Sequence, residues 1–268
     1  MQDTHTKKII ESTFNEVSKR YDTNLFFKIT ASHMANCFDS KDDLTLLDIS
    51  TGTGTVAFEI INKHPNIQIQ AVDISKGMLD VAKEKAHNFN IKNISFKLFD
   101  VEKLHYEKNS FDIITCGFGL FFYSDMHKTF NKLCKTIKKE GLFIFSSFTQ
   151  DAFKPYSDIF LNALEKDYNI SHPKRKSGLL NSQEEIKSFV TKEQNLKYNI
   201  QEVDITYDIT IDQWWELLNS AGYKALLNEL DEKQLQTFKV KHLKEMKDIS
   251  KKDKITLKVN TFITTVFL

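Results

Sequence analysis

Three aspartates lie at the ends of apolar runs that are typical of buried strands. Asp48 lies in the run that begins at Leu44, Asp73 closes the stretch IQIQAVD, and Asp100 follows a third run. Because the carboxyl ends of parallel strands meet at one edge of a sheet, we expect these side chains near one ligand cleft. Carboxylates there can accept hydrogen bonds from sugar hydroxyls or pair with an ammonium group. Each aspartate could also do no more than cap the helix or turn that follows it.

The first of these strands leads into a glycine loop. Its sequence, Ser50-Thr51-Gly52-Thr53-Gly54, lies between the apolar run Leu44–Ile49 and a helix that begins near Val56. Glycine has no Cβ, so the backbone can turn sharply and a ligand can lie against it. The helix start adds free N–H groups aimed at the loop. The stretch fits both the dinucleotide fingerprint G-x-G-x-x-A and the pattern D-x-x-x-G-x-G, and a tight turn without a ligand is a further alternative.

Composition limits the class of protein. The chain has 268 residues, 41% of them hydrophobic, which is enough for one large α/β domain with embellishments or for two small ones. Its formal net charge is +1, from 37 basic and 36 acidic residues, so the chain has no overall attraction to nucleic acid or to an anionic membrane. We therefore expect a small-molecule partner and no nucleic acid.

The cysteines and the hydropathy pattern bear on location. Cys37, Cys116 and Cys134 have no metal-ligand spacing, and a sparse, odd set suits a reducing compartment. No apolar run approaches the length of a membrane span, and the first residues do not resemble a signal peptide. We expect a cytoplasmic protein with no metal and no membrane span.

Strands and helices alternate between residues 44 and 149. The runs are short and apolar where strands are expected, and apolar residues recur at helical spacing between them. This alternation predicts an α/β fold with a parallel, doubly wound, Rossmann-like sheet. The expected strands are 44–49, 67–72, 94–98, an apolar core within 109–120, and 142–148, and the expected helices are 56–63, 76–88 and 125–138.

The flanking regions are expected to complete a single domain over residues 1–268. Residues 7–36 read as helical, and we expect the segment 1–43 to form a lid over the cleft, or else a packing arm. Beyond the core at 44–149, the region 150–268 changes character and is expected to hold further helices and a C-terminal pair of strands. The expected helices are 151–168, 182–192, one capped by Asp212, and 231–249, and the expected strands are 200–209 and 254–268.

Five motifs follow one another along the first part of the chain. They are Val17-Ser18-Lys19-Arg20-Tyr21-Asp22, Leu47-Asp48-Ile49-Ser50-Thr51-Gly52-Thr53-Gly54, Asp73-Ile74-Ser75-Lys76-Gly77-Met78-Leu79, Asn109-Ser110-Phe111-Asp112 and Phe118-Gly119-Leu120. Together they resemble the class I S-adenosylmethionine (SAM)-dependent methyltransferases, most closely the ubiquinone and menaquinone C-methyltransferases and their small-molecule relatives. They displace the dinucleotide interpretation, which predicts neither Asp48 nor the segment 109–120.

The resemblance implies SAM as the cofactor and S-adenosylhomocysteine as the product. It also implies a seven-stranded, mostly parallel sheet with one antiparallel C-terminal strand. In such a site Asp73 would bind the ribose, Asp100 would contact the adenine, and Asp48 would support the loop or the methionine ammonium group. The cofactor residues that it implies are Asp48, Ser50, Gly52, Thr53, Gly54, Asp73, Ile74, Met78, Asp100, Val101 and Gly117.

Two departures from the family pattern bear on the ligands. Ser50 stands where the wider glycine pattern has its first glycine, and Phe121-Phe122 stand where the quinone branch has arginine and asparagine. The loss of that polar pair, together with an insertion at 210–250, favours another acceptor.

Aromatic residues predict an apolar acceptor pocket, although they could equally belong to the core. The pocket would suit a small apolar or aromatic molecule that is methylated at carbon or oxygen. Tyr21, His33, Tyr123 and His127 are candidates for a general base, or else packing residues. The expected pocket residues are Phe118, Phe121, Phe122, Tyr123, Trp214 and Trp215.

Other functions fit parts of the sequence. A SAM-binding protein without catalysis would carry the same cofactor motifs. An NAD(P)-dependent oxidoreductase would account for the glycine loop alone. A nucleic-acid methyltransferase is disfavoured by the balanced charge and by the lack of an N-P-P-Y-type motif. The sequence leaves the oligomeric state open.

Overall fold

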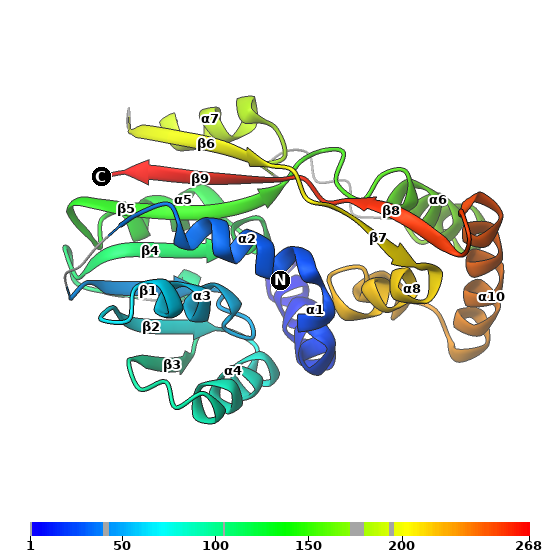
Figure 1. The fold of residues 1–268 in the computed structure, drawn as a ribbon, viewed down its shortest axis with the longest axis horizontal. Helices are drawn as coiled ribbons and strands as arrows, with labels where there is room; N and C mark the ends of the chain where they lie inside the picture. The colour runs from blue at the N-terminus through cyan, green and yellow to red at the C-terminus, as the bar shows by residue number, and fades with distance from the viewer. Residues whose placement is uncertain (1, 40–42, 104, 172–179, 193–195) are drawn as a thin grey trace.

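The computed structural model describes residues 2–39, 43–103, 105–171, 180–192 and 196–268. Its main sheet has seven strands in the order β3-β2-β1-β4-β5-β9-β6 (Figure 1). Strands β1 to β5 pair in parallel, and β9 is antiparallel to both β5 and β6. This arrangement confirms the predicted fold class. The strands are β1 (Thr45–Ile49), β2 (Gln68–Asp73), β3 (Ile94–Leu98), β4 (Phe111–Gly117), β5 (Ile137–Phe148), β6 (Lys197–Val203) and β9 (Thr261–Phe267).

Both faces of this sheet are covered, which explains why its central strands are continuously apolar. On β1, Leu46 and Leu47 belong to separate hydrophobic clusters, because successive side chains point to opposite faces. One cluster includes residues of α2 (Leu25–Ala35) and α3 (Thr55–Lys63). The other includes residues of α5 (Met126–Cys134) and α7 (Gln183–Thr191). Helix α4 (Lys76–Asn88) follows β2.

The predicted extents of the two C-terminal strands, 200–209 and 254–268, are wrong. Each divides into two strands, and the inner halves, β7 (Thr206–Thr210) and β8 (Lys254–Lys258), form a second, two-stranded antiparallel sheet. The Val259 amide donates to the Ile205 carbonyl at 2.8 Å where the chain passes between the sheets. In the first segment the apolar–polar alternation continues from Val203 to Ile209, so the pattern there gives no sign of the passage, whereas in the second segment Asn260-Thr261 interrupts it.

Three helix boundaries also differ from the expectation. The helix expected at 125–138 ends at Cys134, because β5 begins at Ile137 and pairs there with β4. The helix expected to be capped by Asp212 is capped by Thr210 instead, in a reciprocal capping box with Gln213. The helix expected at 151–168 begins at Tyr156.

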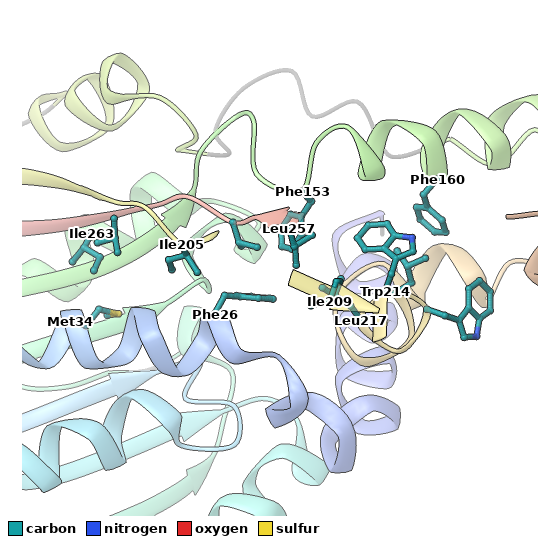
Figure 2. Close-up of a cluster of buried hydrophobic side chains, with 14 of the residues drawn as sticks. Phe26, Met34, Phe153, Phe160, Ile205, Ile209, Trp214, Leu217, Leu257 and Ile263 are labelled. Carbon is teal, nitrogen blue, oxygen red and sulfur yellow. The ribbon is translucent and has the colours of Figure 1, made fainter. Parts of the chain in front are cut away.

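The second sheet and four helices form an extension beside the main sheet (Figure 1). One hydrophobic cluster runs from Phe26 and Met34 on α2 to Trp214 in the extension, so the two parts share a core (Figure 2). Trp214 is fully buried, and its Nε1 donates to Nε2 of the buried His242 at 3.0 Å. The helices are α6 (Tyr156–Tyr168), α8 (Ile211–Ser220), α9 (Lys224–Leu227) and α10 (Glu232–Ile249).

Helix α1 (Gln2–Val17) bridges the main sheet and the extension, and a 3-10 helix, η1 (Ser18–Thr23), links it to α2. The Asn15 side chain accepts hydrogen bonds from the Ser75 hydroxyl at 2.8 Å and the Gly77 amide at 2.7 Å, at the start of α4. Glu16 pairs with Lys224 of α9 at 3.3 Å. In the part of the chain that the structure describes, no helix has both the length and the apolar character needed to cross a membrane.

Candidate active site

The loop between β1 and α3 is held against the end of β2. The Thr51 amide donates to the Val72 carbonyl at 3.0 Å, and the Gly52 amide donates to Asp73 Oδ2 at 2.8 Å. Gly52 and Gly54 have φ angles of 58° and 83°, in the left-handed region that favours glycine. A Cβ at Gly54 would also lie 2.6 Å from the Phe58 ring, so backbone conformation favours glycine at both positions and the lack of space favours it further at Gly54.

The Ser50 side chain has room at its position because residue 119 is a glycine. The φ angle of Ser50 is 50°, which explains why a glycine suits this point of the wider family pattern. The Ser50 hydroxyl lies 2.8 Å from the Tyr123 hydroxyl. A Cβ added at Gly119 would approach Ser50 Cβ to 2.7 Å, so the absence of a side chain at Gly119 makes room for the serine. Compared with the wider family pattern, the chain therefore lacks a glycine at position 50 and has a contact between the Ser50 and Tyr123 hydroxyls instead.

Asp48 is buried and is held by hydroxyl groups. Its two carboxylate oxygens accept hydrogen bonds from the Thr51 and Thr115 hydroxyls, at 2.5 and 2.6 Å. Burial raises the pKa of Asp48 to about 6, against the opposing effect of the two hydroxyls, and the nearby Asp73 carboxylate raises it further. The carboxylate therefore lies in an environment that penalises its negative charge.

Asp73 is held by backbone amides. Its Oδ2 accepts from Gly52, and its Oδ1 accepts from the Ser75 amide at 2.8 Å. Burial raises the pKa of Asp73, although these amides favour the ionised form. Each oxygen keeps a further lone pair with which it could accept a hydrogen bond from a ligand.

Asp100 is paired with helix α1. Lys7 lies 3.0 Å from Asp100 Oδ2 and also contacts the Glu102 carboxylate. The pKa of Lys7 is raised because both carboxylates favour its charged form against the effect of burial. Sequence reasoning did not identify Lys7, which is 93 residues from Asp100 and belongs to none of the motifs.

Three cavities meet at this edge of the sheet. The first, of about 80 Å³, is lined by Asp73, Met78 and Asp100 among others. The second, of about 40 Å³, lies at Asp48 and the glycine loop. The third, of about 400 Å³, is mostly aromatic. Tyr21 and Phe118 line all three cavities, so the three spaces converge there.

The structure brings most of the expected cofactor residues together. The Gly54 backbone shapes the loop but is not among the residues that line the three cavities. The first cavity is lined by Ser50, Gly52, Asp73, Ile74, Met78, Asp100, Val101 and Gly117. The second is lined by Asp48, Ser50, Gly52, Thr53 and Gly117.

The expected acceptor residues divide into two groups. Phe118, Phe121 and Phe122 line the aromatic cavity, while Tyr123 lines the first cavity. Trp214 and Trp215 line none of the three cavities, because both are buried in the core of the extension. This part of the chain lines the aromatic cavity instead through Leu217 of α8 and through Ala221, Gly222 and Tyr223, which lie between α8 and α9.

Of the four candidate bases, two lie at the cavities and two do not. Tyr21 and Tyr123 line cavities, whereas His33 and His127 line none of the three. His127 Nε2 lies 3.2 Å from the Phe189 carbonyl, between α5 and α7. His33 lies half-buried on α2.

Sequence reasoning missed several residues at the site because they lie outside the motifs. Those that line a cavity are Lys7, Phe14, Phe26, Phe27, Thr30, Phe148 and Phe153. The helical spacing of Phe14 and Phe26 was the signal that they face inward, but spacing does not distinguish a cavity wall from a core.

Asp48→Asn should change the pH dependence of stability. Because the pKa of Asp48 is raised in the folded protein, its stabilising contribution is present below about pH 4 and lost as the pH rises through about 6. Without a ligand at pH 8, we expect the variant to have a higher free energy of unfolding than the parent, by about 1–3 kcal/mol. Urea unfolding at pH 4 to 8 measures the difference between the two proteins.

Asp112→Asn is the matched control for this experiment. Burial opposes ionisation of Asp112, but the Thr45 amide and Lys138 outweigh it and lower the pKa. Its stabilising contribution is therefore present at neutral pH and lost as the pH falls, so this variant should be less stable than the parent at pH 8. A loss of stability at pH 8 in the Asp48 variant as well would contradict the assignment.

Asp73→Asn should weaken binding of SAM, the cofactor that the resemblance implies. The change removes the charge of the predicted ribose acceptor, and a hydrogen bond to a charged group contributes about 1.5–3 kcal/mol. We expect the Kd for S-adenosylhomocysteine in calorimetry to rise by roughly 10- to 100-fold. Asp80→Asn, at an exposed carboxylate of α4, should leave the Kd unchanged. An unchanged Kd in the Asp73 variant would remove this residue from the site.

Methyltransferases are among the known proteins to which the chain is similar. A malonyl-[acyl-carrier protein] O-methyltransferase from Acetivibrio thermocellus is 29% identical over 153 residues, which cover 55% of this chain. The chain spans about half of that relative, since the match covers 52% of its length. The ubiquinone/menaquinone biosynthesis C-methyltransferase UbiE from Zymomonas mobilis is 24% identical, with 80% of this chain and 84% of the relative covered.

A solved structure supports the fold. The YcgJ protein from Bacillus subtilis superimposes with a TM-score of 0.60 at 19% identity, over 89% of this chain and 97% of that protein. A family model described as a methyltransferase domain matches residues 40–222, a segment that contains the glycine loop and all three strand-end aspartates. The chain therefore belongs to the methyltransferase domain family and carries a SAM-dependent methyltransferase domain of the class I type.

Proposed function

We propose that the protein transfers the methyl group of SAM to a small, largely apolar or aromatic molecule, at carbon or oxygen. The observation that carries this proposal is the convergence of the aromatic cavity with the two smaller cavities at Tyr21 and Phe118. An acceptor in the aromatic cavity would thus lie beside the cofactor. The printed names of the relatives, an O-methyltransferase and a C-methyltransferase, are compatible with either acceptor atom.

The residues present fit SAM. Asp73 offers free lone pairs to ribose hydroxyls, Ile74 and Met78 offer an apolar surface to the adenine, and Asp48 offers a negative charge to the methionine ammonium group. When bound, SAM supplies an electrophilic methyl group on a sulfonium. The protein's task is then to position the acceptor in line with that group and to exclude water.

In this proposal, the aromatic walls of the third cavity would limit the access of water to the acceptor. Phe14 of α1 packs edge-on against Phe122, with ring centroids 5.4 Å apart, and Tyr21 stacks on Phe27 at 4.3 Å. The two charged lining residues, Lys154 and Asp158, are exposed near the start of α6, and Thr149, Gln150, Ser157 and Asn181 add neutral polar groups. A planar acceptor would be held mainly by contact and stacking on the aromatic rings.

Among the described residues that line the cavity, no buried group is suited to accept the acceptor's proton, and Asp158, which carries the lining carboxylate, is exposed. Among the described residues that line it, the only titratable side chains are Tyr21, Lys154, Asp158 and Tyr223. Burial raises the pKa of Tyr223 to about 12 and raises that of Tyr21 further still, with Asp73 and Asp22 adding to the effect. Both phenols are therefore neutral at pH 7. We expect an acceptor that is acidic enough to ionise by itself, such as a phenol or a carbon acid.

Helix α1 is proposed to act as the lid of this site. Lys7 and Phe14 line the first cavity, and Asn15 binds the start of α4. The first two cavities are far smaller than the roughly 300 Å³ of an ordinary ligand site, so α1 must move for a cofactor to enter.

The lid predicts a local change in hydrogen exchange. With S-adenosylhomocysteine bound, the amides of residues 7–17 should exchange more slowly, because the cofactor adds contacts beneath α1. Helix α10 lines none of the three cavities and serves as the internal control. Protection at the glycine loop without any change in α1 would argue against the lid.

The acceptor proposal is tested by label transfer. The protein is incubated with methyl-labelled SAM and either a mixed library of phenols and carbon acids or fractions of tRNA, DNA and protein. Label should appear in a small molecule. Label that appears only in a macromolecule would overturn the proposal, and SAM binding without any turnover would favour the non-catalytic alternative.

Phe121→Ala should then separate acceptor use from cofactor binding. Phe121 lines the aromatic cavity but neither of the other two, so the KM of the identified acceptor should rise by about 10-fold or more while the Kd of SAM stays the same. Phe89→Ala, at a phenylalanine that is 74% exposed, should alter neither constant. Equal losses of acceptor use and SAM affinity would place Phe121 in the cofactor site instead.

A further inference from the structure

The second cavity is lined by a buried hydroxyl that has no hydrogen-bond partner among the described residues. Thr30 of α2 is 1% exposed, and its Oγ1 has no hydrogen-bond partner within the described part of the chain. Burying a hydroxyl without a partner costs free energy, so such a group calls for an explanation. Thr30 lines the cavity at Asp48 and the glycine loop.

The place of Thr30 on α2 makes a hydroxyl unexpected. Phe26, Thr30 and Met34 follow one another at intervals of four residues, so they share one stripe of the helix. Figure 2 shows Phe26 and Met34 among the buried hydrophobic side chains, and all three residues are buried. Valine has nearly the shape of threonine and would serve a purely apolar stripe without the cost of the buried hydroxyl.

The other groups around the cavity indicate which ligand atom the hydroxyl serves. Among the described lining residues, Asp48 is the only charged side chain, so the cavity offers a partner to a cation but no lysine or arginine to an anion. Thr55 and Val56 line it at the start of α3, where the first amides of a helix have no partner within the helix. The hydroxyl of Ser146 accepts from the Phe118 amide at 3.1 Å and keeps its own proton for donation.

We infer that Thr30 donates a hydrogen bond to the α-carboxylate of the methionine half of SAM. Asp48 takes the ammonium group of the same half, and the carboxylate is bound by neutral donors and not by a basic side chain. The inference rests on SAM binding in this cleft and is independent of the identity of the acceptor.

The test is a comparison of three ligands on Thr30→Val. SAM carries both the ammonium and the carboxylate, decarboxylated SAM keeps only the ammonium, and 5′-methylthioadenosine lacks both. Because a hydrogen bond to a charged group is lost, the Kd of SAM in calorimetry should rise by roughly 10-fold. The Kd values of decarboxylated SAM and 5′-methylthioadenosine should stay within about two-fold of the parent.

Thr264→Val is the matched control. Thr264 of β9 is also buried with an unpartnered hydroxyl, but it lines none of the three cavities. Without a ligand, both variants should melt at or above the Tm of the parent, because each loses a buried hydroxyl without a partner. Only Thr30→Val should show a smaller increase of Tm on addition of SAM.

Two outcomes would overturn the inference. An unchanged Kd of SAM in Thr30→Val would show that the hydroxyl does not contact the cofactor. An equal loss for all three ligands would show that Thr30 maintains the shape of the cleft and not a contact with the carboxylate. A parent protein that binds no SAM would overturn the cofactor assignment itself, which is a separate result.

Discussion

The electrostatics of this site depend on two buried carboxylates, Asp48 and Asp73. Asp48 and Asp73 both have raised pKa values, and Asp73 adds to the rise at Asp48. Within the described part of the chain, neither forms an ion pair with a lysine or arginine, and hydroxyls and backbone amides hold both. Burying like charges in this way costs free energy. A ligand that carries an ammonium and a sulfonium would offset that cost, so the charge of these carboxylates suits SAM.

The glycine loop and the N-terminal helices hold those carboxylates in place. Asp73 reaches the Gly52 amide only because the loop turns through left-handed angles at Gly52 and Gly54. The loop is held on its other side by Asp22 of η1, which accepts from the Thr53 hydroxyl at 2.6 Å and pairs with Lys85 at 2.6 Å. The N-terminal helices are thus tied to the glycine loop by charged and polar contacts, and they supply the outer wall of the cleft.

The sequence predicted the parts of this arrangement that are local in the chain. The strand, the glycine loop and Asp73 follow from short patterns whose geometry is set by neighbouring residues. The Lys7–Asp100 pair joins residues 93 positions apart, and no local pattern reports it. Trp214 and Trp215 were assigned to the pocket from their aromatic character, but a buried tryptophan serves a core as well as a cavity, and only the placement of α8 distinguishes the two roles. The alternation from Val203 to Ile209 hides the division of the first C-terminal strand, because it continues from one sheet into the other.

The two halves of the site depend on different parts of the chain. The nucleotide half is built from strand ends and the glycine loop, where backbone geometry tolerates few changes. The aromatic cavity takes its walls from α1 and α2, from the segment that follows β4, from the end of β5 and from the turns before α6 and after α8; they include Phe14, Phe153 and Tyr223. Most of these walls are side chains on helices and turns, which can be exchanged without moving the central strands. The acceptor can therefore differ among proteins that share this cofactor site, and its chemistry must be inferred from these side chains and not from the glycine loop and the strand-end aspartates.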